Sequence, residues 1–161
     1  LTEHDISDFD TQCHVRPPLR SKRDREALRR ALKSGVLGAI CSDHQPHEPD
    51  AKLAPFAQSE PGISALETLL PLTLKLVDEN VLELVEAIAL LTNKPAQILG
   101  IEAGQLSIGS TADVCVFDLK STWTLTEDQI RSRGHNTPFL GHGFRGRVTH
   151  TLVGGKVVFE L

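Results

Sequence analysis

The sequence contains no methionine among its 161 residues. A translated chain begins with methionine, and removal of that residue normally requires a small residue after it, whereas this sequence begins with Leu1. We therefore expect the sequence to be the C-terminal piece of a longer protein. A functional site in this chain would then be shared with a missing N-terminal segment.

Long apolar runs, a signal peptide and basic clusters are also missing. No apolar run reaches the roughly 18 residues that a membrane span needs, and nothing indicates secretion. The basic residues of 22–30 alternate with Asp24 and Glu26 and lack interleaved aromatics, which is typical of a solvated helix face and not of a nucleic-acid surface. Cysteines are few and widely spaced, so we expect buried, reduced thiols of a cytoplasmic protein at Cys13, Cys41 and Cys115.

What is present is typical of a globular domain, with 40% hydrophobic and 24% charged residues and a net charge of −4. The first 35 residues are predicted to form a capped turn after Thr2, an extended segment over 9–15 and a helix over 22–34. Because of the prolines at 17 and 18, residues 16–20 cannot be the interior of a helix. Ser21 is a typical N-cap, with Asp24 completing a variant of the capping box, and Gly35 ends the helix.

The segment from 36 to 100 has the order strand, loop, helix. The short apolar run Val36–Cys41 is typical of a buried parallel strand. A long loop rich in proline and acidic residues follows as far as Pro61, and loops of this length are usually functional or disordered. Helices are then predicted over 63–78, 81–92 and 95–99. This order is typical of an α/β protein with a parallel barrel or a doubly wound sheet.

The remaining residues change in character. Short strands are predicted over 112–119, 121–125, 147–153 and 156–160. The pair Gly154–Gly155 is a two-residue hairpin signal between the last two of them. We therefore divide the chain into an α/β body, residues 1–100, and a β-rich tail, residues 101–161.

Asp43 is the main candidate for chemistry. It follows the predicted buried strand directly, and in parallel barrels that position faces the mouth where active sites lie. His44 and His47 come close behind it. A carboxylate there could bind a metal ion and accept a proton from metal-bound water. Alternatively, Asp43 caps the loop and both histidines are surface residues; the residues alone leave the two interpretations about equal.

The segment Ser42–His47 resembles the dihydroorotases, which are (β/α)₈ metal hydrolases of the amidohydrolase superfamily. The resemblance covers nearly the whole chain, and its other parts are Pro17–Arg20, Asp24–Leu28, Lys52, Phe56, Pro61–Ile63, Ala65–Thr68, Pro95–Ala96, Gly109–Asp118, Asn136–Phe139 and Gly146–Val158. It implies the C-terminal βα units of a TIM-type (β/α)₈ barrel, followed by a small β-rich tail that belongs to a composite side domain.

The resemblance also implies roles for individual residues. Asp43 would contact zinc, of which the complete enzyme would hold two ions, and would carry a proton to the leaving amide nitrogen. His47 would bind the carboxylate of the substrate, and the backbone of Pro61 and Gly62 would hydrogen-bond its pyrimidine ring. The reaction would be the reversible interconversion of N-carbamoyl-L-aspartate and dihydroorotate in pyrimidine biosynthesis.

Two departures from the family pattern are visible. Arg16 stands where many relatives have an asparagine that contacts substrate, and it could pair with the substrate carboxylate or simply anchor its loop. The other metal ligands of the family are missing, and none of Cys13, His14, His135, His142 or His150 has a context that replaces them. A complete barrel takes about 250 residues. We therefore expect the chain alone to be inactive and to bind zinc weakly.

Other functions remain open. A hydantoinase- or allantoinase-like cyclic amidase would share the chemistry, but His47 with Pro61–Gly62 favours a substrate that has a carboxylate. A non-catalytic dihydroorotase-like scaffold for aspartate transcarbamoylase would share the fold, although the presence of Asp43 and His47 argues against it. The expected partners are therefore the missing barrel segment, a second copy of the protein or aspartate transcarbamoylase, and no nucleic acid or membrane.

Overall fold

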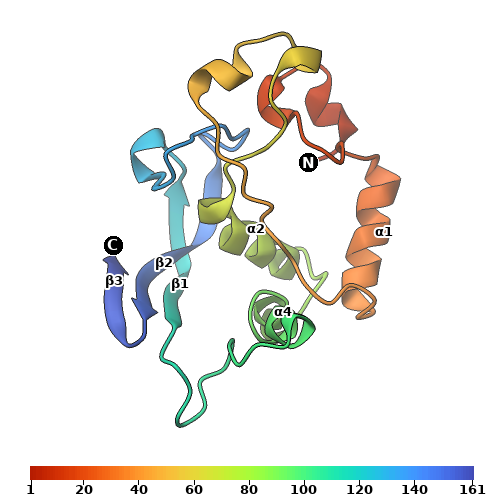
Figure 1. The fold of residues 1–161 in the computed structure, drawn as a ribbon. Coiled ribbons are helices and arrows are strands. Elements are labelled where there is room, and N and C mark those ends of the chain that lie inside the picture. Colours follow the sequence, from red (N-terminus) through yellow and green to blue (C-terminus); the bar gives the residue numbers. More distant parts are fainter. The chain divides into compact units, whose positions relative to one another are not determined.

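The computed structural model describes residues 1–161 and resolves them into two compact units. The first unit consists of Leu1–Ala31, Ser42–Leu69 and Thr124–Gly143. The second consists of Leu32–Cys41, Leu70–Trp123 and Phe144–Leu161. Each unit is therefore built from three separate stretches of chain. Figure 1 colours the chain by residue number, so that each stretch can be found by its colour.

The first unit holds most of helix α1 and several short 3₁₀ turns. Helix α1 spans Lys22–Lys33, as predicted to within one residue. The Ser21 hydroxyl accepts a hydrogen bond from the Asp24 amide at 3.2 Å and donates to the Asp24 carboxylate at 3.0 Å, which is the predicted cap. Gly35 follows the helix with φ +76°, a conformation that favours glycine. The 3₁₀ turns are Glu3–Ile6, Thr11–Cys13, Pro49–Lys52, Phe56–Gln58 and Glu127–Gln129.

Two local predictions at the start of the chain have different outcomes. The capped turn after Thr2 is confirmed, because the Thr2 amide donates to the Asp5 carboxylate at 2.6 Å. The extended segment over 9–15 is wrong at its centre, where Thr11–Cys13 form a 3₁₀ turn. The Asp10 carboxylate caps that turn by accepting from the Gln12 amide at 2.9 Å.

The predicted strand over 36–41 does not form. The Ile40 amide donates instead to the Leu90 carbonyl oxygen at 3.0 Å. A buried parallel strand needs neighbouring strands to accept its hydrogen bonds, and nothing in residues 1–161 supplies one beside this segment. Parallel pairing appears further along the chain, as a single bridge between His44 and Ile63.

The second unit contains most of the helical core. Helix α2 spans Leu66–Asp78 and belongs to this unit from Leu70 on, α3 spans Leu84–Ala89 and α4 spans Asn93–Leu99. Helix α2 begins three residues later than predicted, because Ile63 and Ser64 are engaged in hydrogen bonds to other segments. A buried cluster forms where the helices of this unit pack, from Leu82, Ala87 and Leu90 with Leu32, Ile40, Leu76, Val77 and Val81 around them.

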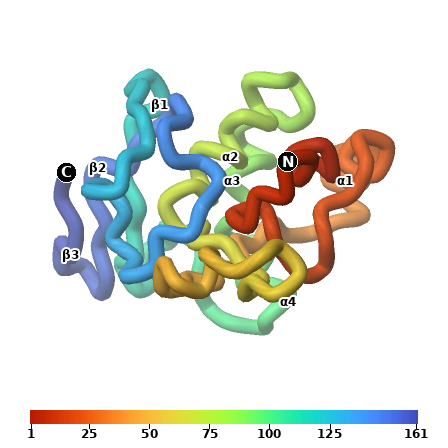
Figure 2. Tube along the Cα trace, turned by 90° about the horizontal axis from the view of Figure 1, so that it is seen from above, coloured from red at the N-terminus to blue at the C-terminus, as the bar shows by residue number.

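A small sheet completes the fold. Strands β1 (Val114–Thr124), β2 (Gly143–Val153) and β3 (Lys156–Glu160) lie in the order β1-β2-β3, side by side in Figures 1 and 2. Strand β1 is continuous where two strands were predicted. The predicted hairpin is confirmed: β2 and β3 pair antiparallel, and Gly154 and Gly155 both have positive φ between them. The chain is thus an α/β protein with a three-stranded sheet.

The cysteines are only partly as predicted. All three cysteines are free, but only Cys13 is buried, whereas Cys41 and Cys115 are exposed in this chain. Burial of the latter two was predicted from strand-like apolar runs, and the first of those runs forms no strand. None of the helices has the length and apolarity that a membrane crossing needs.

Candidate active site

The loop that begins at Asp43 is pinned against residues 62–64 within the first unit. The Gln45 amide donates to the Ile63 carbonyl oxygen at 2.9 Å, next to the bridge between His44 and Ile63. The amide group of Asn136 donates to the carbonyl oxygens of Gln45 and Gly62, each at 3.0 Å. Two segments that are distant in sequence therefore lie against each other at the predicted site.

His47 is held at both its backbone and its ring. Its amide donates to the side-chain oxygen of Asn136 at 2.6 Å. Its ring atom Nε2 lies 3.0 Å from the carbonyl oxygen of Pro61. A carbonyl can only accept, so Nε2 carries a proton and donates it. The other ring nitrogen, Nδ1, makes no hydrogen bond in this chain and is the atom left for a ligand.

The Pro61–Gly62 backbone is partly used within the chain. The Gly62 amide donates to the His14 carbonyl oxygen at 2.8 Å, so this N–H group is not open to a ligand. The carbonyl oxygens of Pro61 and Gly62 each accept one hydrogen bond from the protein, and each has a second lone pair. Any hydrogen bond from this backbone to a substrate would therefore be accepted by a carbonyl oxygen.

Position 62 also requires glycine for reasons of space. Gly62 has φ +138°, which side chains rarely adopt. A Cβ atom there would lie 2.6 Å from Cβ of Gln45 and 3.0 Å from Nε2 of His47. The close approach of the loop to His47 thus depends on the missing side chain.

Asp43 is exposed, and its carboxylate makes few contacts within the chain. Its backbone has φ +44°, in the left-handed region. Its Oδ1 accepts a hydrogen bond from the side chain of Gln45 at 3.1 Å. No three His, Cys, Asp or Glu side chains of residues 1–161 converge where they could hold a metal ion. The residues of this chain therefore do not form a metal site by themselves.

His44 has a structural position. Its Nδ1 accepts a hydrogen bond from the Ala65 amide at 3.0 Å, and its Nε2 lies 3.3 Å from the Ser132 hydroxyl. Both ring nitrogens are therefore engaged within the protein, just before the start of α2. His44 ties the loop to the helix and leaves neither ring nitrogen open to a ligand.

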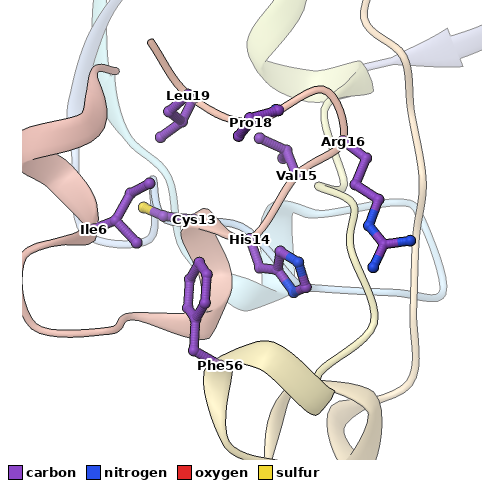
Figure 3. Close-up of a pocket in the computed structure, with 8 residues that line it drawn as sticks. All are labelled: Ile6, Cys13, His14, Val15, Arg16, Pro18, Leu19 and Phe56. Carbon is purple, nitrogen blue, oxygen red and sulfur yellow. The ribbon is translucent and has the colours of Figure 1, made fainter. Parts of the chain in front are cut away.

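Arg16 lies at the edge of an apolar cavity of about 230 Å³ in the first unit. Figure 3 shows Ile6, Cys13 and Leu19 on one side of the cavity, with the Arg16 guanidinium pointing away from them. The side chain of Arg16 is exposed and makes no ion pair or hydrogen bond in this chain. Nothing in this chain therefore supports the interpretation of Arg16 as a loop anchor.

His14 and Lys52 connect the Arg16 segment to the loop that ends at Gly62. The His14 ring packs on Phe56 with a centroid distance of 4.7 Å, and its Nδ1 lies 2.9 Å from the Ser59 hydroxyl. Lys52 is 5% exposed, and its ammonium donates to the Glu60 carbonyl oxygen at 2.6 Å. Burial lowers the pKa of Lys52, against the opposing influence of nearby acidic groups. Sequence reasoning assigned His14 no role as a metal ligand, and in the structure His14 supports the loop that ends at Gly62.

The structure brings three of the five predicted residues, His47, Pro61 and Gly62, into direct contact. Asp43 is linked to them through Gln45. Arg16 follows the His14 segment, whose carbonyl oxygen accepts from Gly62. Sequence reasoning assigned no role to Asn136, although Asn136–Phe139 belongs to the pattern that resembles the dihydroorotases.

A family model described as the amidohydrolase family matches residues 7–158. This chain belongs to the amidohydrolase family. The match agrees with the predicted resemblance and spans both structural units.

Relatives of this amidohydrolase chain include a "dihydroorotase-like protein" from Pseudomonas aeruginosa, 49% identical over 160 residues, and a "dihydroorotase" from Geobacter metallireducens, 44% identical over 160 residues. Each alignment covers 99% of this chain and 38% of the relative. The chain therefore spans well under half the length of the curated relatives it matches.

Solved structures of hydantoinases have the same fold over this length. The L-hydantoinase (dihydropyrimidinase) from Arthrobacter aurescens superposes with a TM-score of 0.90 and 30% identity, over 99% of this chain and 37% of that one. The D-hydantoinase (dihydropyrimidinase) from Thermus sp. gives a TM-score of 0.84 and 27% identity, over 93% of this chain and 34% of that one. The amidohydrolase chain thus has the fold of the matching part of these proteins.

Proposed function

We propose that the protein containing this chain is a cyclic amide hydrolase that interconverts N-carbamoyl-L-aspartate and dihydroorotate. The chain would supply a substrate-binding wall, formed by the His47 ring and the Pro61–Gly62 carbonyls, and the carboxylate of Asp43 as the group that transfers the proton. The observation that carries the proposal is His47, whose Nε2 is locked onto Pro61 while Nδ1 stays open. The names of the curated relatives support the same reaction.

The substrate carboxylate would be bound by positively charged donors. With Nε2 committed to Pro61, protonation of the His47 ring places the second N–H on Nδ1, which can donate to a carboxylate. Arg16 has an exposed guanidinium with no partner in the chain and could form a bidentate pair with the same group. This proposal takes the substrate-binding interpretation of Arg16.

The cyclic amide would be oriented by backbone carbonyls. Its ring N–H groups are donors, and the carbonyl oxygens of Pro61 and Gly62 each have a lone pair to accept them. The Gly62 N–H is already used by His14. The site would therefore favour a ring with N–H groups along this edge and reject one with only acceptors there.

Asp43 would move the proton. Its carboxylate is exposed and accepts only one hydrogen bond from a side chain, so it can accept a proton from the attacking water and pass it to the leaving nitrogen. By resemblance the complete enzyme uses zinc. Asp43 would then be the single ligand from this chain, and the other ligands would lie in the length of the relatives that this chain does not span.

Hydantoin hydrolysis is the second candidate, because the solved structures that match are hydantoinases. Hydantoin is a cyclic amide but lacks the carboxylate of dihydroorotate. Since His47 and Arg16 would recognise that carboxylate, we expect preference for dihydroorotate. A scaffold without activity is the third candidate, and turnover by the full-length protein would decide against it.

The test is turnover by the full-length protein loaded with zinc, on dihydroorotate and on hydantoin. We expect faster turnover of dihydroorotate, and a loss in kcat of roughly a hundredfold or more for Asp43→Asn. Asp50→Asn, which changes another exposed carboxylate of the same loop, should keep full activity. The isolated chain of 161 residues should be inactive with added zinc; robust turnover by it would sink the idea that the site is shared.

A further inference from the structure

Asn136 is the most connected polar side chain near the proposed substrate wall. It is 4% exposed. Its Oδ1 accepts from the His47 amide at 2.6 Å, and its Nδ2 donates to the Gln45 and Gly62 carbonyl oxygens, each at 3.0 Å. Its own carbonyl oxygen accepts from the Ser64 amide at 2.8 Å. One residue therefore joins both segments that carry the wall.

The chemistry of these partners requires an asparagine. The His47 amide can only donate, and the two carbonyls can only accept, so the partners fix the orientation of the Asn136 amide. Aspartate has the same shape but lacks the two N–H donors, and its charge would face two carbonyl oxygens. Glutamine has the same groups on a longer stem. Buried polar groups left without partners are costly, so the site tolerates neither change well.

Gly134, two residues before Asn136, lies directly against the His47 backbone. A Cβ atom at Gly134 would lie 2.5 Å from the His47 nitrogen and 2.7 Å from its oxygen. Residues 134–136 thus contact the His47 backbone by shape as well as by hydrogen bonds. Because the Gly62 carbonyl accepts from the same amide group, a shift of Asn136 displaces both halves of the wall together.

We propose that Asn136 is a positioning residue that sets the distance between the His47 ring and the Pro61–Gly62 carbonyls, and so the fit of the substrate. This inference rests on the proposed function. Asn136 would not touch the substrate itself; it acts through His47 and Gly62. Its loss should weaken substrate binding far more than the chemical step, which depends on Asp43.

The test uses the full-length protein with Asn136→Ala and the nearly isosteric Asn136→Asp. We expect KM for dihydroorotate to rise about tenfold or more in both, with kcat lowered by less than about threefold. The matched control is Thr137→Val. Thr137 is next in sequence and equally buried, but its hydroxyl accepts only from the Phe139 amide, at 3.4 Å. This variant should keep the parent KM even if its melting temperature falls.

Hydrogen exchange of the His47 amide gives a second readout that needs no turnover. We expect this amide to exchange about tenfold faster or more in Asn136→Ala and at the parent rate in Thr137→Val. An unchanged KM in a folded Asn136 variant, or an equal rise in Thr137→Val, would overturn the inference. If the parent protein does not turn over dihydroorotate, the proposed function fails. The exchange rate then decides the positioning role, and an unchanged rate rejects it.

Discussion

Nε2 of His47 donates to the carbonyl oxygen of Pro61 across 3.0 Å, and this contact decides which nitrogen remains for a ligand. A glutamine at position 47 could place an amide N–H near Nε2 but has nothing at the place of Nδ1. The contact of His47 with the loop and its proposed binding of a ligand can therefore be separated by mutation.

We expect His47→Gln in the full-length protein to raise KM for dihydroorotate about tenfold or more, because a charge-assisted hydrogen bond to the carboxylate is lost. Its melting temperature should stay closer to that of the parent than that of His47→Ala, which also loses the bond to Pro61. Steady-state kinetics and thermal melts measure the two effects. The control is His4→Gln, at an exposed histidine of the first 3₁₀ turn, which should change neither. A normal KM for His47→Gln would remove His47 from the binding site.

Gly62→Ala tests the close approach of the loop. The added methyl group would meet Gln45 and His47, so something must shift, and the φ of +138° adds backbone strain. We expect the free energy of unfolding to fall by about 1–3 kcal/mol, together with a rise in KM. Gly109→Ala is the matched control, since Gly109 has φ +90° but no atoms near the added carbon. Equal losses of stability in the two variants would show that only backbone strain matters.

The reactivity of the Cys13 thiol should differ between the folded and the unfolded protein. Burial, with help from the charges of Asp10 and Asp5, raises the pKa of the Cys13 thiol to about 11 from an ordinary value of 9.0. The thiolate fraction at pH 8 is then about 100-fold lower than in the unfolded chain. Because Cys13 is also only 2% exposed, we expect iodoacetamide to alkylate it at least about 100-fold more slowly in the folded full-length protein than in urea, measured by mass spectrometry of the peptide.

The same shift affects stability in alkaline solution. A raised pKa in the folded state means that the contribution of Cys13 to stability is present below about pH 9 and is lost as the pH rises through about 11. Cys13→Ala should therefore lose less stability between these two values than the parent does. Denaturant unfolding at several pH values measures the difference, and parallel curves for the two proteins would contradict the shift.

Elements with local signals could be predicted from the sequence. Helix α1 was predicted to within one residue, because Ser21 and Gly35 mark its ends through contacts of a few residues. The β2–β3 hairpin was predicted from Gly154–Gly155 for the same reason. The strand over 36–41 was wrong, because a parallel strand exists only beside partners and an apolar run carries no information about them.

The candidate site was likewise predicted only in part from the sequence. The sequence pattern indicated His47, Pro61 and Gly62, and the structure brings them into contact. It could not indicate the role of Asn136, whose side-chain partners lie 74–91 residues away along the chain. Nothing in the residues around Asn136 predicts which carbonyls it would meet. The sequence also could not show that the Arg16 side chain is exposed and has no hydrogen-bond or ion-pair partner in this chain.

The backbone of Asp43 has one last consequence. Its φ of +44° lies in the left-handed region, which glycine adopts without steric cost. Replacement of Asp43 by glycine would therefore relieve about 1 kcal/mol of backbone strain. If Asp43 had no chemical task, Asp43→Gly would be an improvement that random substitution could find in one step. If Asp43 carries the proton as proposed, selection for stability and selection for catalysis act in opposite directions at this residue. A lineage that abandoned the reaction would be free to discard this carboxylate, and its fold would benefit.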